Sequence, residues 1–143
     1  MKAEFLAKLR SDAAVSAVAG SIAVGQGFRP AIDWVARRSD DASAFPAATL
    51  QVISGEGDYD QDGRTRFEEP RIRVTSFGAS YQDARDLHDA LQLVIETPGE
   101  VNGVRFHRAK LVLERDLPPE KLNDRLNIYR VAADYRVPAT LGD

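Results

Sequence analysis

The chain contains no cysteine among its 143 residues. This absence excludes disulfide bonds, thiolate zinc sites and a cysteine nucleophile together, and it fits a reducing compartment or a particle assembled in one. Histidine is scarce as well, because only His88 and His107 occur, and neither has a metal-like spacing to another ligand. We expect His88 at the edge of a helix's apolar stripe and His107 on the wetter face of a strand.

Long apolar runs and an excess of basic residues are also missing. Residues 1–15 contain no long apolar run, so the sequence predicts neither a signal peptide nor a transmembrane span, and no membrane partner. The formal net charge of −3 argues against a protein that coats duplex DNA. Hydrophobic residues make up 43% and charged residues 29%, which is the balance of a soluble globular protein, and the length suits one domain over residues 1–143.

Signatures of catalysis and nucleotide binding are absent too. No GxSxG elbow surrounds any serine, and no spacing selects a general acid and base from the 22 carboxylates. The segment GSIAVGQG (residues 20–27) has the glycine spacing of half a phosphate loop, but it lacks the Lys and the Ser or Thr that phosphate and magnesium need. We therefore expect these glycines to mark turns, and we expect no catalytic residue, no cofactor and no enzymatic activity.

One segment, DYDQDGRTRFEE, matches the calcium loop of an EF-hand. Its acidic places one, three, five and twelve and its turn glycine are all filled, by Asp58, Asp60, Asp62, Glu69 and Gly63. An EF-hand loop lies between two helices, whereas the patterns on both sides here predict strands, and Arg64 and Arg66 place positive charges inside the cage. We favour a charged hairpin tip that binds no metal. A calcium-binding or small-ligand module is the alternative.

Apolar periodicity predicts an α+β fold. Helical spacing occurs at residues 2–10 and, after Ser11 and Asp12 as a cap, up to residue 18. The clearest helix begins after Ser80, which can act as its N-cap with Asp83 as the partner. Its apolar stripe consists of Ala84, Leu87, Leu91, Val94 and Ile95. Between residues 20 and 46 only short strands or a single helical turn are indicated.

Alternating patterns predict four strands, at residues 47–53, 71–76, 104–113 and 129–137. The alternation slips between Phe106 and Ala109, which indicates a bulge in the third strand. LPPEKLNDR (residues 117–125) is expected to be a loop. We therefore expect a single four-stranded sheet, mainly antiparallel or mixed, with helices on one face. The chain then divides into N-terminal helices, a sheet-and-helix core and a short tail, at residues 2–18, 47–137 and 138–143.

Five elements then occur in a characteristic order: a strand end, an Asp-Tyr turn, an R-x-x-V strand, an S-Y-x-x-A-R helix start and a closing Y-R-V-x-x-D-Y-R-V strand. They are Ile53-Ser54-Gly55, Asp58-Tyr59, Arg71 to Val74, Ser80 to Arg85 and Tyr129 to Val137. In this order they resemble the tail-completion, or tail-terminator, proteins of long-tailed bacteriophages and gene transfer agents. The resemblance spans roughly residues 45–137, with a weaker echo in the N-terminal helices.

The resemblance implies a non-enzymatic virion protein that works as a ring, usually of six copies. Such a ring sits on the last disc of the tail tube, stops its growth and offers a surface to the head connector, while DNA only passes through its lumen. The implied partners are other copies of the chain, the major tail tube protein and a connector or stopper protein. The implied location is the bacterial cytoplasm during assembly and then the head–tail junction of the particle.

Within this interpretation another connector component, such as a stopper, is the nearest alternative role. The charged hairpin tip is the candidate assembly contact, because it is polar throughout and has almost nothing apolar to hold it. Its candidate residues are Asp58, Asp60, Asp62, Arg64 and Arg66.

Overall fold

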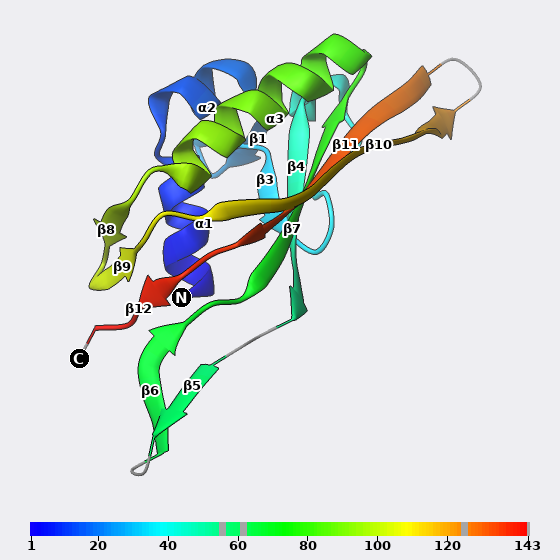
Figure 1. Ribbon diagram of the computed structural model, residues 1–143. Helices are drawn as coiled ribbons and strands as arrows, with labels where there is room; N and C mark the ends of the chain where they lie inside the picture. Colours follow the sequence, from blue (N-terminus) through cyan, green and yellow to red (C-terminus); the bar gives the residue numbers. More distant parts are fainter. Residues whose placement is uncertain (55–56, 61–62, 124–125, 143) are drawn as a thin grey trace.

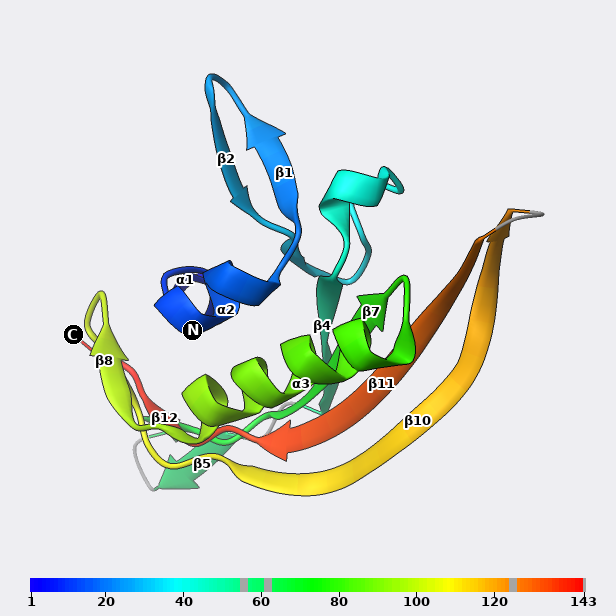
Figure 2. The same cartoon turned by 90° about the horizontal axis from the view of Figure 1, so that it is seen from above.

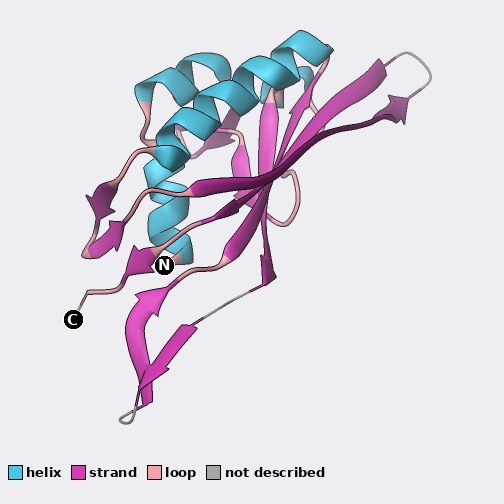
Figure 3. Cartoon of the chain, in the orientation of Figure 1, coloured by secondary structure: helices cyan, strands magenta, loops and turns pink. Residues whose placement is uncertain are grey.

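The computed structural model describes residues 1–54, 57–60, 63–123 and 126–142, with the backbone path alone at 57–60 and 63–65. Figure 1 shows the described elements in sequence colours, and Figure 3 separates helices from strands. Three α-helices lie on one side of a long twisted sheet within this part of the chain. The predicted α+β class is confirmed.

The two N-terminal helices form where the helical spacing predicts them. They are α1 (Lys2–Arg10) and α2 (Ala13–Val18). Asp12 caps the second helix, because its Oδ1 accepts a hydrogen bond from the Val15 amide at 3.0 Å. Phe5 and Leu9 of α1 are fully buried, so this helix contributes to the core of the fold.

Helix α3 (Tyr81–Glu96) is the longest helix and begins at the predicted cap. The Ser80 side chain accepts a hydrogen bond from the Asp83 amide at 3.2 Å. The buried face of the helix consists of Ala84, Leu87, His88, Leu91 and Ile95. Each large aliphatic side chain on this face contributes roughly 1.5–3 kcal/mol by burial. This face packs on the main sheet, so α3 anchors the core.

The main sheet has five strands in the order β10-β11-β7-β4-β3. In chain order their bounds are β3 Ile32–Trp34, β4 Ala47–Ser54, β7 Arg71–Gly78, β10 Lys110–Asn123 and β11 Leu126–Arg136. Only the pair β3–β4 is parallel, and the other pairs are antiparallel. The helices cover one face, and among the described elements no helix covers the other (Figure 2). Strands β10 and β3 are the two edges of this sheet.

A second five-stranded sheet, in the order β5-β6-β12-β9-β8, lies beside the first. Its bounds are β5 Gly57–Asp60, β6 Gly63–Glu68, β8 Gly99–Val101, β9 Val104–Phe106 and β12 Ala139–Thr140. Strand β12 pairs with β6 on one side and with β9 on the other. The segment 138–143, expected to be a tail, therefore supplies the central strand of this sheet.

The arm, residues 21–30, is a two-stranded hairpin of β1 (Ser21–Val24) and β2 (Gly27–Pro30) that projects from the body (Figure 2). Gly25 occupies the turn with a φ of 58°, a left-handed conformation that glycine adopts without steric cost. Gly25 therefore serves turn geometry, as the sequence indicates, whereas at Gly20 a Cβ would lie 2.5 Å from the Ala44 backbone carbon, so that glycine allows a close approach of the chain. A short 3₁₀ turn, η1 (Ala42–Ala44), follows before β4.

The prediction of a single four-stranded sheet is wrong, because the described residues form three sheets. The slip in alternation between Phe106 and Ala109 is a change of sheet and not a bulge: β9 pairs with β8 and β12, whereas β10 pairs with β11. The expected loop at 117–125 is wrong over residues 117–123, since β10 and β11 continue as paired strands there, with Glu120 opposite Ile128. Residues 124–125 lie outside the described part of the chain. Pro118 and Pro119 are tolerated because β10 is an edge strand with a register shift at this point.

One cluster of buried apolar side chains joins the helices to both five-stranded sheets. It runs from Phe5 and Leu9 of α1, through Leu87 and Leu91 of α3, to Ala139 of β12. Within the described residues, no helix has both the length and the apolarity needed to cross a bilayer.

Candidate functional site

The charged hairpin tip is the candidate contact that the sequence indicates. Strands β5 and β6 pair as an antiparallel hairpin within the EF-hand-like segment, with Asp60 opposite Gly63. Strands β4 and β7 come before and after the segment, so strands and not helices flank it. Asp62 lies outside the described residues, and so do the side chains of Asp58, Asp60 and Arg64. Arg66 is exposed, and its carbonyl accepts a hydrogen bond from the Leu141 amide at 2.8 Å. The role of these five residues in assembly stays a prediction.

No metal centre is apparent in the part of the chain that the structure describes, where no three His, Asp or Glu side chains are grouped to hold an ion. His88 is buried, deeper than the expected position at the edge of the stripe, and its Nε2 lies 2.7 Å from Oε1 of Glu114. His107 is half-buried, and its Nε2 lies 2.8 Å from the Thr140 hydroxyl of β12. Each histidine therefore has a structural partner.

The helix-free face of the main sheet carries a buried carboxylate between two arginines. Asp134 of β11 is only 1% exposed. Arg71 Nη2 lies 2.9 Å from its Oδ2, and Arg73 Nε lies 2.8 Å from its Oδ1, both reaching across from β7. Desolvation of the carboxyl by burial favours its neutral form, but the hydrogen bonds from Arg73 and Arg71 outweigh that effect and hold the pKa of Asp134 below its ordinary value. Two guanidiniums on one carboxylate leave this face with a positive charge.

Replacing Asp134 by asparagine should weaken the fold at neutral pH and reduce its sensitivity to acid. Because the folded pKa is below 3.8, the ion pairs stabilise fully above that pH, and this stabilisation is lost as the pH falls through the folded pKa. Hydrogen bonds to charged groups contribute about 1.5–3 kcal/mol, which sets the expected loss at pH 7. Urea unfolding at pH 7 and pH 3 measures it, with the exposed Asp40→Asn as the control. An unchanged acid dependence would contradict the assignment.

A seam joins the segment after β3 to the β10–β11 hairpin on this same face. Arg37 Nη2 lies 3.2 Å from both Asp40 and Glu120, and its guanidinium stacks over the Phe77 ring at 4.6 Å. A hollow of about 350 Å³ lies along the seam and is lined in part by Thr49. Arg37 forms ion pairs with two carboxylates of the same chain. The seam therefore holds the segment after β3 against the β10–β11 hairpin.

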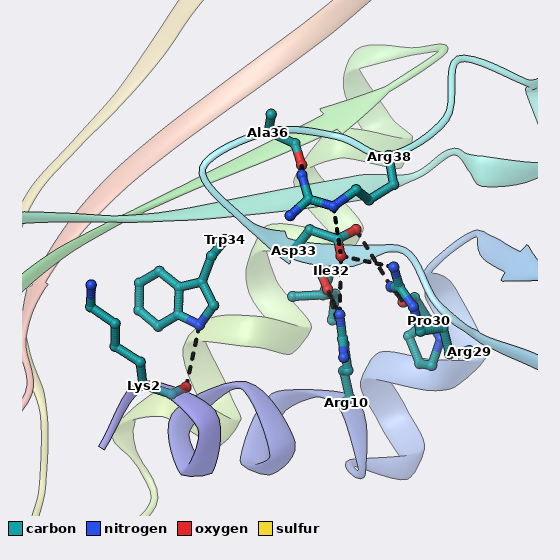
Figure 4. A network of polar contacts seen from close by, with 9 residues as sticks. All are labelled: Lys2, Arg10, Arg29, Pro30, Ile32, Asp33, Trp34, Ala36 and Arg38. Carbon is teal, nitrogen blue, oxygen red and sulfur yellow. Dashed lines mark hydrogen bonds and ion pairs between the residues drawn. The ribbon is translucent and has the colours of Figure 1, made fainter. Parts of the chain in front are cut away.

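The base of the arm is held by a buried carboxylate, Asp33 of β3, which is surrounded by three arginines (Figure 4). The distances to its Oδ1 are 3.0 Å from Arg10 Nη2, 2.8 Å from Arg29 Nη2 and 3.9 Å from Arg38 Nε. Arg10 also donates to the Ile32 carbonyl at 2.8 Å. Desolvation and the neighbouring Arg29 lower the pKa of Arg10, although Asp33 opposes this shift. Three guanidiniums and one carboxylate leave a local charge excess of about +2.

On its helix side, the opposite edge of the main sheet carries the reverse charge. Arg85 Nη1 of α3 lies 2.7 Å from Glu114 of β10, and the Tyr81 hydroxyl donates to Asp116 at 3.2 Å. Arg85 is the one arginine of this helix, which has no lysine and carries Asp83, Asp86 and Asp89 on its exposed side. Lys110 and Arg115 of β10 are opposite Arg136 and Ala132, which places both basic side chains on the helix-free face of the sheet. The helix side of β10 is therefore acidic.

Two groups of exposed apolar side chains accompany these charges. Those on the arm and just after β3 are Val24, Phe28 and Val35, and Val24 lies on the other face of the hairpin from Phe28, which is opposite Ala23. Those at the start of β10 are Leu111, Val112 and Leu113, with Leu111 opposite Tyr135 and Leu113 opposite Asp134. Contiguous exposed apolar side chains mark contact surfaces more often than isolated ones do. The sequence patterns predicted neither group and not the Asp33 cluster. The apolar residues Phe28 and Val35, which have arginines close by in the sequence, are the signal that could have indicated a contact surface.

Comparison with solved structures finds the fold of this chain elsewhere. A chain from the virion of a native gene transfer agent particle superposes with a TM-score of 0.62 at 16% sequence identity, over 98% of this chain and 94% of that chain. The two chains share a fold. No family model and no curated protein matches the sequence.

Proposed function

We propose that this chain is a non-enzymatic structural protein of a phage-like particle, where it forms the ring that terminates the tail. The observation that carries the proposal is the full-length likeness to a chain of a gene transfer agent virion, which spans 98% of this chain and 94% of that one. A likeness over both whole chains, without large insertions, supports a similar structural task for this chain. The separate resemblance of residues 45–137 to tail-terminator proteins supplies the specific role.

The geometry of the main sheet suits assembly into a ring. The arm and Val35 flank β3 with exposed apolar side chains near the arginines around Asp33, whereas β10, at the opposite end of the sheet, presents Leu111, Val112 and Leu113 next to acidic residues on its helix side. Surfaces that differ on the two sides of a subunit make head-to-tail contacts, which close into a ring when the rotation between copies allows it. The terminator ring, of about six copies, would contact the major tail tube protein below and the connector above, while DNA passes through its lumen.

Removing the gene should leave DNA-filled heads and tail tubes that fail to join. The tubes should also be variable or over-long, because identical discs present the same addition surface each time and only a different ring stops the series. Electron microscopy of particles made without the gene measures both properties, and particles with the gene restored on a plasmid are the control. Normal-length tails attached to heads would reject the proposal. Unattached tails of normal length would assign the stopper role instead.

A further inference from the structure

The arm edge, which we define as Val24, Phe28 and Val35 together with the arginines around Asp33, exposes apolar side chains beside basic ones. Phe28 and Val35 are each 77% exposed. Val35 also has a φ of 73°, a strained conformation for a β-branched residue, and its amide donates to the Leu50 carbonyl at 2.8 Å. The fold thus holds an apolar side chain outward at an energetic cost. Such strain clusters at functional positions, such as active sites, ligand clamps and switch regions.

The β10 edge, which we define as Leu111, Val112 and Leu113 together with Glu114 and Asp116, is the complementary surface. On its helix side it offers Leu111 next to Glu114 and Asp116, with Lys110 and Arg115 on the other face of the strand, whereas the arm edge offers apolar side chains beside a positive excess. The register shifts between Leu111 and Leu113 and again after Leu117. These irregularities and the two prolines prevent continuous strand pairing along the edge, so a contact there is short and depends on side chains.

We propose that the arm edge of one copy docks on the β10 edge of the next copy in the ring. The inference rests on the proposed ring, and it identifies the surfaces that build it. Within one copy the segment after β3 reaches β10 at Glu120, whereas the arm projects from the β3 side of the main sheet and residues 111–116 lie at the start of β10, on the opposite edge (Figure 2). Opposite charge and shared apolarity make the second copy the occupant, and a head-to-tail contact between unlike surfaces propagates around a ring.

Cysteine cross-linking in assembled particles tests this contact, since the natural chain has no cysteine to interfere. The double variant Phe28→Cys with Val112→Cys, treated with a short bismaleimide, should lose its monomer band to a ladder of covalent multimers. Each single variant should give no ladder, and particles containing both single variants in equal amounts should give dimers only. The control pair is Phe28→Cys with Leu93→Cys, because Leu93 is 68% exposed on α3, outside both edges. That pair should stay monomeric.

The outcomes separate the contact from the proposed function. Dimers from either single variant alone would show that the same surface contacts itself on two copies, and this would overturn the proposal. A ladder from the control pair, with none from the test pair, would also overturn it. Matching thermal midpoints of the purified natural and double-variant proteins show that both cysteines leave the fold intact. Loss of tail termination without the gene, combined with no ladder, would reject this contact and keep the function. A ladder combined with normal tails in the absence of the gene would keep the contact and reject the function.

Discussion

Replacing Leu91 by alanine is expected to lower the free energy of unfolding by about 2–5 kcal/mol. Leu91 is 1% exposed on the face of α3 that packs against β7 and β11, so truncation leaves a cavity between the helix and the sheet. This loss is a large share of a total stability of about 5–15 kcal/mol. Urea or thermal unfolding of the purified chain measures it.

The matched control is Leu93→Ala, which makes the same chemical change on the same helix. Leu93 is exposed, so this substitution should stay within about 0.5 kcal/mol of the natural chain. A loss below about half a kcal/mol at Leu91 would mean that the stripe is not the core anchor.

Replacing Asp33 by alanine should cost about 3 kcal/mol, the lower end for removing one partner of a buried ion pair. The carboxylate is 4% exposed, and its loss leaves three guanidiniums facing one another with no counter-charge. The arginines are partly exposed and turn toward water, which keeps the cost at that lower end. The arm should also lose its anchor, because Arg29 at its base is held by Asp33.

Thermal unfolding measures the stability loss, and hydrogen exchange at residues 21–30 measures the release of the arm. Asp40→Ala is the control, since Asp40 is exposed and pairs with an arginine that has a second partner in Glu120. It should change little. Equal midpoints for the two alanine variants would show that the cluster at Asp33 contributes nothing.

The helices were predictable because their signals are local. The caps at Asp12 and Ser80 and the 3.6-residue stripe of α3 are properties of neighbouring residues, and the structure confirms them. The sheets were not, because strand order depends on contacts far apart in sequence. The slip in alternation between Phe106 and Ala109 fits a bulge as well as a change of sheet. The two prolines of β10 suggest a loop, and they fit a strand only once β10 is known to lie at the edge of the sheet.

The candidate surfaces were harder still to predict. Arg29 and Arg38 lie within five residues of Asp33 in the sequence, whereas Arg10 reaches it from α1, which packs beside β3. A three-residue strand carries too little periodicity to be recognised in a sequence. The charged hairpin tip was visible in the sequence, and its part in assembly stays a prediction.

The central claim, that this chain is the terminator ring of a tail, is tested most directly by a cryo-electron microscopy reconstruction of the head–tail junction of the assembled particle. The account expects one ring of this fold at the head-proximal end of the tail tube, with each arm against the β10 edge of its neighbour. A ring in which neither edge touches the neighbour would contradict the proposed contact alone. Density for this fold repeated along the tube, or found only in the head, would contradict the central claim.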